Sequence, residues 1–220
     1  MCGRFTITVS PEELKADFDL ASVPQGMMPR FNIAPSQDVP VVTSQAPDKL
    51  VLYRWGLVPS WAKDPAMGNR MINARADTLA QKPAFKTSFK KKRCIVLADG
   101  FYEWKAEGAV KIPFYVRLKT RRPFSFAGLW DHWKSSEDEE IYSCTIITTE
   151  PNKLLNPIHD RMPVILERED RAIWLNPKVE DLDRLSKMLL PYPDEDMEAY
   201  PVSTLVNSPA IDREECIAPS

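Results

Sequence analysis

The clearest strand signal in this chain is Arg93-Cys94-Ile95-Val96-Leu97-Ala98-Asp99-Gly100-Phe101-Tyr102-Glu103-Trp104. Cys94–Ala98 is a short, unbroken apolar run, which is typical of a strand buried on both faces. The aromatic segment Phe101–Lys105 follows it directly, and Ile112–Leu118 reads as its hairpin partner around a turn at Glu107-Gly108. This stretch therefore predicts a β-rich core.

Other elements are expected on either side of this stretch. Further strands are predicted at Thr6–Val9, Val39–Thr43, Leu50–Trp55, Phe124–Leu129, Ile141–Thr149 and Pro201–Leu205. Helices are predicted after the capping box at Ser10 as far as about Asp19, and over Ala84–Lys92, Glu167–Leu175 and Val179–Leu190. Residues 21–36 form a proline-rich loop and residues 59–72 are irregular. Because strands dominate the middle and helices lie mostly outside them, the expected class is α+β, with mixed and antiparallel sheets and peripheral helices.

The composition is that of an ordinary folded domain. The chain has 220 residues, of which 44% are hydrophobic and 27% charged, and we expect one compact domain over residues 1–220 with a short C-terminal tail from about residue 207. The apolar runs are far shorter than the roughly 20 residues that a spanning helix needs. Acidic residues stand where a signal peptide would need its apolar core. A soluble, cytoplasmic protein is therefore expected.

The net charge of −2 is unevenly distributed. Residues 1–133 carry 20 Lys+Arg and 12 Asp+Glu, a net charge of +8, whereas residues 134–220 carry 9 and 19, a net charge of −10. The basic part contains the run Lys90–Arg93 and several arginines next to aromatic residues. Cations that track phosphates and aromatics that stack on bases favour a single-stranded nucleic acid as partner. A solvated helix end and core aromatics are the alternative explanation.

The four cysteines do not form a metal-site pattern. They lie at positions 2, 94, 144 and 216, with no CxxC pair, and the chain has only two histidines. A structural zinc site usually takes four Cys or His ligands, so no metal is expected. Cys94 and Cys144 lie in apolar strands and are expected to be buried.

Cys2 is the exception because it follows Met1 directly. Removal of Met1 would leave Cys2 with an α-amine of pKa about 7.7–8.0 and a thiol of pKa about 8.5 on one residue. Such a 1,2-aminothiol condenses with an aldehyde to an imine, and its thiol then closes a five-membered thiazolidine ring. Alternatively, the thiol attacks an acyl group while the amine serves as base.

Three further segments carry polar residues in settings typical of a site. Asn73 and Arg75 stand among small residues, and Glu103 lies between aromatic residues just after the buried strand. A carboxyl group in apolar surroundings tends toward a raised pKa, which suits general acid–base catalysis. His159 lies in a loop fixed by Pro157 and Pro163, and histidine is the usual proton carrier near neutral pH. A salt bridge for Glu103 and a purely structural His159 are the alternatives.

Taken together, these segments resemble the SRAP (SOS-response-associated peptidase) family. The matching motifs are Met1–Phe5, Asn73–Thr78, Ala98–Trp104 and His159–Pro163, and two others are Arg30–Pro35 and Trp55–Pro59. Their order and spacing agree from residue 1 to about Val206. The resemblance implies an SRAP-like fold.

The resemblance also implies a function: binding of single-stranded DNA that contains abasic sites, and a covalent cross-link that shields the lesion. Cys2 would form a thiazolidine with the ring-opened sugar, and Asn73 would position the Cys2 backbone or the sugar. Glu103 would move protons during imine formation, and His159 would assist sugar ring opening and reversal. The "peptidase" of the family name would be the removal of Met1 by the protein's own site.

The resemblance assigns DNA contacts to further residues. Arg4, Arg75 and Arg161 would contact phosphates, and Trp61 and Trp104 would stack against the bases or wedge the duplex side away. Pro35 and Thr148 would line the channel, and Gly3 would also contact DNA. No cofactor, metal or membrane is implied, and we expect a monomer that associates with the bacterial nucleoid when it acts on DNA.

Two other functional classes remain open from the sequence. An N-terminal-nucleophile amidohydrolase, such as a class II glutamine amidotransferase, also begins Met-Cys-Gly, although such enzymes usually continue with Ile or Val where this chain has Arg4. A noncovalent reader of single-stranded or modified DNA would need only the basic and aromatic residues.

Overall fold

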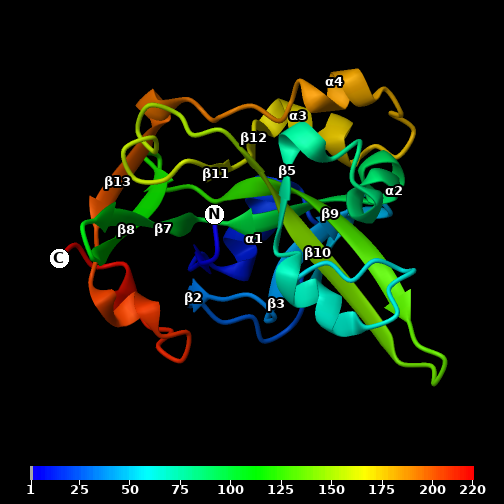
Figure 1. Cartoon of the computed structure of the whole chain (residues 1–220), viewed down its shortest axis with the longest axis horizontal. Coiled ribbons are helices and arrows are strands. Elements are labelled where there is room, and N and C mark those ends of the chain that lie inside the picture. The colour runs from blue at the N-terminus through cyan, green and yellow to red at the C-terminus, as the bar shows by residue number, and fades with distance from the viewer. Residues whose placement is uncertain (1) are drawn as a thin grey trace.

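The computed structural model describes residues 2–220, and the predicted removal of Met1 therefore concerns a residue outside the described ones. The centre of the molecule is a closed barrel of five strands (Figure 1). Each strand pairs with the next in the cyclic order β10–β4–β3–β6–β9–β10, and only the β10–β4 pairing is parallel. The five strands are β3 (Asp38–Thr43), β4 (Ala46–Trp55), β6 (Arg93–Ala98), β9 (Phe124–Lys134) and β10 (Glu140–Thr149).

A second, antiparallel sheet of five strands lies beside the barrel, in the order β13–β8–β7–β1–β2. Its strands are β13 (Met197–Pro201), β8 (Val110–Leu118), β7 (Gly100–Glu107), β1 (Phe5–Ile7) and β2 (Arg30–Ile33). Because β6 of the barrel runs through Asp99 directly into β7, the stretch Arg93–Trp104 joins the two sheets. Three short strands complete the barrel edge: β5 (Asn73–Arg75), β11 (Met162–Pro163) and β12 (Ile165–Leu166).

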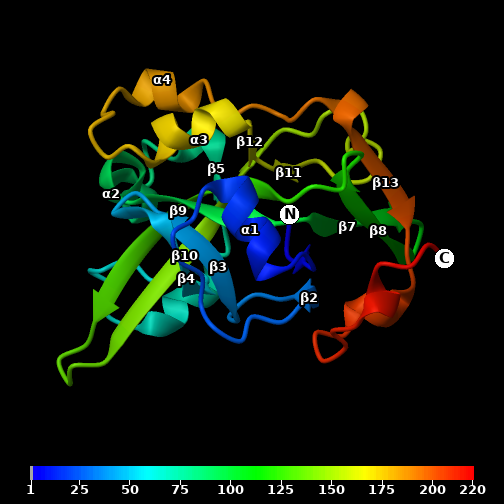
Figure 2. The same cartoon turned by 180° about the vertical axis from the view of Figure 1, so that it is seen from behind.

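The helices are short and peripheral. They are α1 (Pro11–Phe18), α2 (Pro83–Lys91), α3 (Arg168–Leu175) and α4 (Leu182–Ser186), with 3-10 turns at Pro65–Arg70, Ala76–Thr78, Asp194–Asp196, Thr204–Asn207 and Glu214–Cys216. Ser10 caps α1 through a complete capping box, as its sequence predicts. Seen from behind, α3 and α4 lie at one end of the molecule, and the C-terminal segment lies at the opposite corner (Figure 2). No helix among residues 2–220 has the length and apolar character needed to cross a membrane.

The predicted α+β class, with mixed sheets and peripheral helices, is confirmed, but three local predictions are wrong. The expected helix over Val179–Leu190 shrinks to α4, because Asp181 caps a start at Leu182 and Pro191 follows soon after. The last strand is β13 rather than Pro201–Leu205, because its pairing partner β8 fixes the register. The proline-rich loop over residues 21–36 also contains β2, which β1 recruits as an edge strand.

The segment after residue 207, where we expected a short tail, packs on β2. The Asp212 carboxylate accepts hydrogen bonds from the backbone amides of Phe31 (2.5 Å) and Asn32 (3.0 Å) and forms an ion pair with Arg30. Cys216, which belongs to this segment, is fully buried. Cys94 and Cys144 are also buried, as predicted.

Candidate functional site

Cys2 lies at the seam between the barrel and the second sheet, and its side chain is fully buried. The following strand holds it there: Phe5 pairs with Phe101 of β7 and with Ile33 of β2. The Phe5 ring also packs edge-on against Trp55 of the barrel, with ring centroids 5.2 Å apart. The N-terminal segment is therefore anchored to both halves of the molecule, and Cys2 is held in one place.

Asp99 and Gly100 supply the next layer of support for the N-terminal strand. The Asp99 carboxylate accepts hydrogen bonds of 2.5 Å from the Thr6 hydroxyl, the Thr8 hydroxyl and the Thr8 backbone amide. A Cβ on Gly100 would lie 2.1 Å from the Tyr115 hydroxyl oxygen, so only glycine fits there without displacing Tyr115. Asp99 thus fixes the strand that carries Cys2.

Asn73 reaches Cys2 from the barrel side. Its strand β5 runs parallel to β10, with Asn73 opposite Ile146. The Asn73 side-chain amide donates a 2.7 Å hydrogen bond to the Cys2 carbonyl oxygen. Asn73 therefore contacts the carbonyl group of the peptide bond between Cys2 and Gly3.

Glu103 stands on β7 and faces a solvent-open cavity of about 430 Å³. The cavity is lined by Glu103, Trp104, Lys111, His159 and Asn207. Glu103 is only 1% exposed, and this burial raises the pKa of its carboxyl group to about 7. Both protonation states of Glu103 are therefore populated near neutral pH, which is the condition for efficient general acid–base work.

His159 lies in the loop between β10 and β11, across the cavity from Glu103. Its Nε2 atom is 3.9 Å from the Glu103 carboxylate. The Arg161 backbone amide donates to Nδ1 (3.1 Å), and the exposed Asp160 carboxylate lies 2.9 Å from the same atom. An amide N–H can only donate and a carboxylate can only accept, so these two neighbours require opposite protonation states of Nδ1. Burial lowers the pKa of His159, which favours the neutral ring.

The Cys2 thiol is held in its protonated form. Burial, and secondly the charge of Glu103, raise its pKa well above the ordinary value for cysteine. A reaction at this sulfur therefore needs a nearby group to take its proton.

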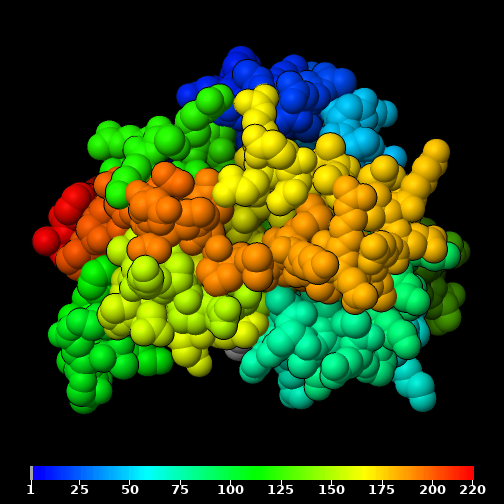
Figure 3. Space-filling model, turned by 90° about the horizontal axis from the view of Figure 1, so that it is seen from above, coloured from blue at the N-terminus to red at the C-terminus, as the bar shows by residue number. Residues whose placement is uncertain are grey.

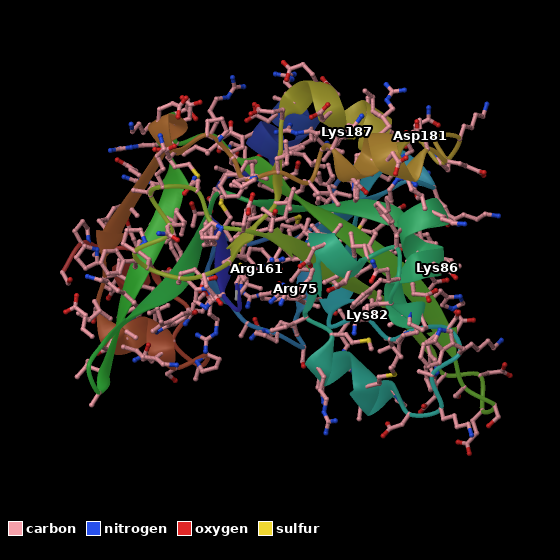
Figure 4. The ribbon with its side chains drawn as sticks, turned by 45° about the horizontal axis from the view of Figure 1, so that its top comes forward. Arg75, Lys82, Lys86, Arg161, Asp181 and Lys187 are labelled. Atoms are coloured by element: carbon pink, nitrogen blue, oxygen red, sulfur yellow. The ribbon has the colours of Figure 1, made fainter. Side chains whose placement is uncertain are left out.

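Two arginines border this site at the end of β10. Arg75 of β5 pairs in register with Thr148, and the Arg161 guanidinium donates to the Thr148 carbonyl oxygen (2.5 Å). Arg75 also forms a two-pronged ion pair with Asp77, with contacts of 2.8 and 3.2 Å. Figure 4 shows Arg75 and Arg161 close together on one face. Thr148 itself is fully buried, and its hydroxyl also accepts a longer hydrogen bond, of 3.4 Å, from the Arg161 guanidinium.

The other residues expected to contact DNA are distributed around this centre. The Trp104 indole lines the cavity and donates a 2.8 Å hydrogen bond to the Asn207 side chain. Arg4 already bonds inside the protein, to Asn32 (2.9 Å) and to the Val206 carbonyl oxygen (2.6 Å). Trp61 is 58% exposed and borders a separate hollow of about 510 Å³. Gly3 and Pro35 are partly exposed.

Sequence reasoning missed Lys111 and Asn207, which also line the cavity. Lys111 is one of many surface lysines in the sequence, and Asn207 falls in the segment expected to start the tail, so neither carried a signal. Within residues 2–220 no three His, Cys, Asp or Glu side chains are grouped so as to hold a metal ion.

Comparison with known proteins shows close relatives. The family model for SOS response associated peptidase (SRAP) matches residues 1–209. The abasic site processing protein YoqW of Bacillus subtilis is 48% identical, with 99% of each chain covered. The abasic site processing protein HMCES of Xenopus tropicalis is 33% identical over 99% of this chain and 78% of its own length. A crystal structure of a Bacteroides thetaiotaomicron protein superposes with a TM-score of 0.91 at 31% identity, with both chains fully covered.

Proposed function

The chain belongs to the SOS response-associated peptidase (SRAP) family, and from that premise we propose that it captures abasic sites in single-stranded DNA through Cys2. The cross-link would shield the lesion during the DNA damage (SOS) response. One observation carries this proposal: Asn73 bonds to Cys2, and Glu103 and His159 face each other across a solvent-open cavity beside that residue. The names of the relatives, abasic site processing proteins, support the same substrate.

The proposed chemistry uses both nucleophiles of an N-terminal cysteine. Hydrolysis of the Met1–Cys2 bond by the protein's own site frees the α-amine. The amine adds to the C1′ aldehyde of the ring-opened sugar, and loss of one water gives an imine. The thiol then adds to the same carbon while its proton passes to the nitrogen, which closes a thiazolidine. Removal of Met1 consumes one water and capture of the aldehyde releases one, nothing is oxidised or reduced, and the reverse of the capture steps releases the protein.

The protons in these steps are assigned to Glu103 and His159. Because the pKa of Glu103 is raised to about 7 by burial, it accepts a proton from the attacking groups of Cys2 and returns it to the departing hydroxyl. His159, 3.9 Å from Glu103, donates a proton to the sugar ring oxygen and so assists ring opening and, in reverse, ring closure. Asn73 holds the Cys2 backbone while these bonds change.

The DNA is held by groups around the cavity. Arg75 and Arg161 contact phosphates, and Trp104 forms an aromatic wall of the cavity against which a base stacks. Trp61 offers a second exposed indole at a distance from the cavity. Arg4 anchors the C-terminal segment through Val206 and contacts phosphate with its remaining N–H groups.

A denaturing gel tests the proposal. Untagged protein, with loss of Met1 checked by mass spectrometry, is mixed with single-stranded DNA that carries one abasic site. We expect a shifted band that survives denaturation and that disappears when the aldehyde is reduced beforehand or when Cys2→Ala is used. Noncovalent binding of Cys2→Ala should remain near that of the wild type.

Other results would favour the other classes. An undiminished band with Cys2→Ala would exclude Cys2 as the attachment point. Binding without any band would favour a noncovalent reader. Ammonia release from glutamine, abolished in Cys2→Ala, would favour an amidohydrolase.

A further inference from the structure

The segment between β5 and β6 is the most one-sidedly charged part of the chain. No acidic residue occurs between Asp77 and Asp99, whereas six cations do: Lys82, Lys86, Lys90, Lys91, Lys92 and Arg93. Four of these six cations, Lys82, Lys86, Lys92 and Arg93, differ in their surroundings. These differences show which cations serve the fold.

Two of the six, Arg93 and Lys92, make contacts within the protein. Arg93 is fully buried, and its guanidinium donates to the carbonyl oxygens of Trp174 (2.6 Å) and Lys90 (2.6 Å) at the ends of α3 and α2. Lys92 forms a 2.6 Å ion pair with Asp131 on β9. Both residues tie α2 and its neighbours to the barrel, so they are occupied in folding.

Lys82 and Lys86 have no such role. Lys82 precedes α2 directly and Lys86 lies one turn further on, while Phe85 and Phe89 fill the buried side of the helix. Both lysines are exposed, and in the described part of the chain no carboxylate lies within 4 Å of either ammonium group. Nothing in the fold uses these two charges.

The two lysines continue a line of cations that begins at the cavity. Arg161 and Arg75 meet over Thr148, and the short turn Ala76–Thr78 leads from β5 toward α2. Figure 4 shows Arg161, Arg75, Lys82 and Lys86 following one another across the same face, and Figure 3 shows the segments around residues 150–161 and 65–90 adjoining in the lower half of the view. We call these four side chains the cationic row. Two carboxylates, Asp77 and Asp160, accompany it, so the row keeps an excess of positive charge.

We propose that the cationic row binds the sugar–phosphate backbone on one side of the lesion, with Lys82 and Lys86 extending the DNA contact beyond the cavity. This inference rests on the proposed function. The row leaves the cavity in one direction from Arg161, whereas Trp104 and Lys111 line the cavity on the second sheet. Lys82 and Lys86 therefore serve nucleotides on one flank of the abasic site. Their contacts are with phosphates, so they add affinity without base preference.

Salt dependence of binding tests the row directly. Each phosphate contact on a single strand contributes roughly −0.7 to the slope of log K against log salt concentration. For a strand carrying a tetrahydrofuran abasic analogue, which cannot react, the double variant Lys82→Ala/Lys86→Ala should lose about 1.4 from that slope. The matched control is Lys178→Ala/Lys187→Ala, which removes two exposed lysines near α4; Lys187 lies far from the row in Figure 4. The control should keep the wild-type slope.

Substrate truncation tests the one-sided placement. Strands with the lesion next to the 5′ end, or next to the 3′ end, leave nucleotides on one flank only. The defect of Lys82→Ala/Lys86→Ala should persist with one of these strands and vanish with the other. An unchanged salt slope, an equal loss in the control variant, or an equal defect with both strands would contradict the proposal that the cationic row binds DNA on one flank of the lesion. Absence of any cross-link from wild-type protein to aldehyde DNA would instead refute the proposed function, independently of the row.

Discussion

Asp99 directly precedes β7 and Glu103 lies within it. Both side chains are buried, but their surroundings differ. Asp99 stands just before the strand and accepts hydrogen bonds from both hydroxyls and one amide of the Thr6–Thr8 segment. Glu103, four residues on, faces an open cavity with His159 3.9 Å away. The Asp99 carboxylate fixes the N-terminal strand, and the Glu103 carboxylate lies near Cys2, which precedes that strand.

The difference shows that burial alone does not make an acid reactive. At Asp99 a set of hydrogen-bond donors matched to the carboxylate ties two segments together. At Glu103 desolvation dominates, and the pKa rises to about 7. A raised pKa next to a cavity is what acid–base chemistry needs, whereas a saturated carboxylate holds the structure.

The largest effect is expected for Glu103→Gln, which keeps the shape of the side chain and removes its titration. Loss of a positioned acid–base group should slow cross-linking by about a hundredfold to ten-thousandfold. The pH–rate profile should also lose its inflection near pH 7, where the wild-type carboxyl titrates. Single-turnover gel assays between pH 5 and 9 provide the measurement.

Glu103→Gln also carries its own control, because its noncovalent affinity for a tetrahydrofuran-containing strand should stay close to that of the wild type. A variant that cross-links at the wild-type rate with an unchanged profile would restrict Glu103 to a structural role.

Asp99→Ala should act on stability instead. It leaves the buried Thr6 and the half-buried Thr8 without their shared acceptor, which should lower the free energy of unfolding by about 3 kcal/mol. Urea denaturation of the wild type and the variant checks this value. A loss of less than about 0.5 kcal/mol, the scatter of ordinary surface substitutions, would remove Asp99 from the account of how Cys2 is placed.

The last effect is the pH dependence of stability that Glu103 contributes. Folding raises the pKa of Glu103 from 4.5 to about 7, so in that window the folded protein holds a proton that the unfolded chain has released. Stability contributed at this site is therefore lost as the pH rises through the window. Glu103→Gln should gain about 3 kcal/mol relative to the wild type between pH 4.5 and pH 8. If the difference in free energy of unfolding between variant and wild type is the same at both pH values, the pKa of Glu103 is not raised.

Sequence reasoning predicted the barrel strands because their apolar runs are local signals, and it predicted the hairpin β7–β8 from its turn. It did not separate Asp99 from Glu103, because the donors to Asp99 lie more than 90 positions earlier in the chain. The run Lys90–Arg93 is the most basic stretch of the sequence, yet Arg93 is buried and Lys92 forms an ion pair with Asp131. The three-residue strand β5 and the contact between Trp104 and Asn207 depend on tertiary neighbours alone. For the site residues the structure shows which are neighbours, and their roles stay predictions.

The most direct test of the central claim is the intact mass of the cross-linked product. Protein and abasic single-stranded DNA are combined without reductant, and the denatured conjugate is weighed and then digested to locate the attachment. We expect the mass of the chain lacking Met1 plus that of the DNA, minus one water, with the link at Cys2. A conjugate that retains Met1, one formed without loss of water, or attachment at any other residue would contradict it.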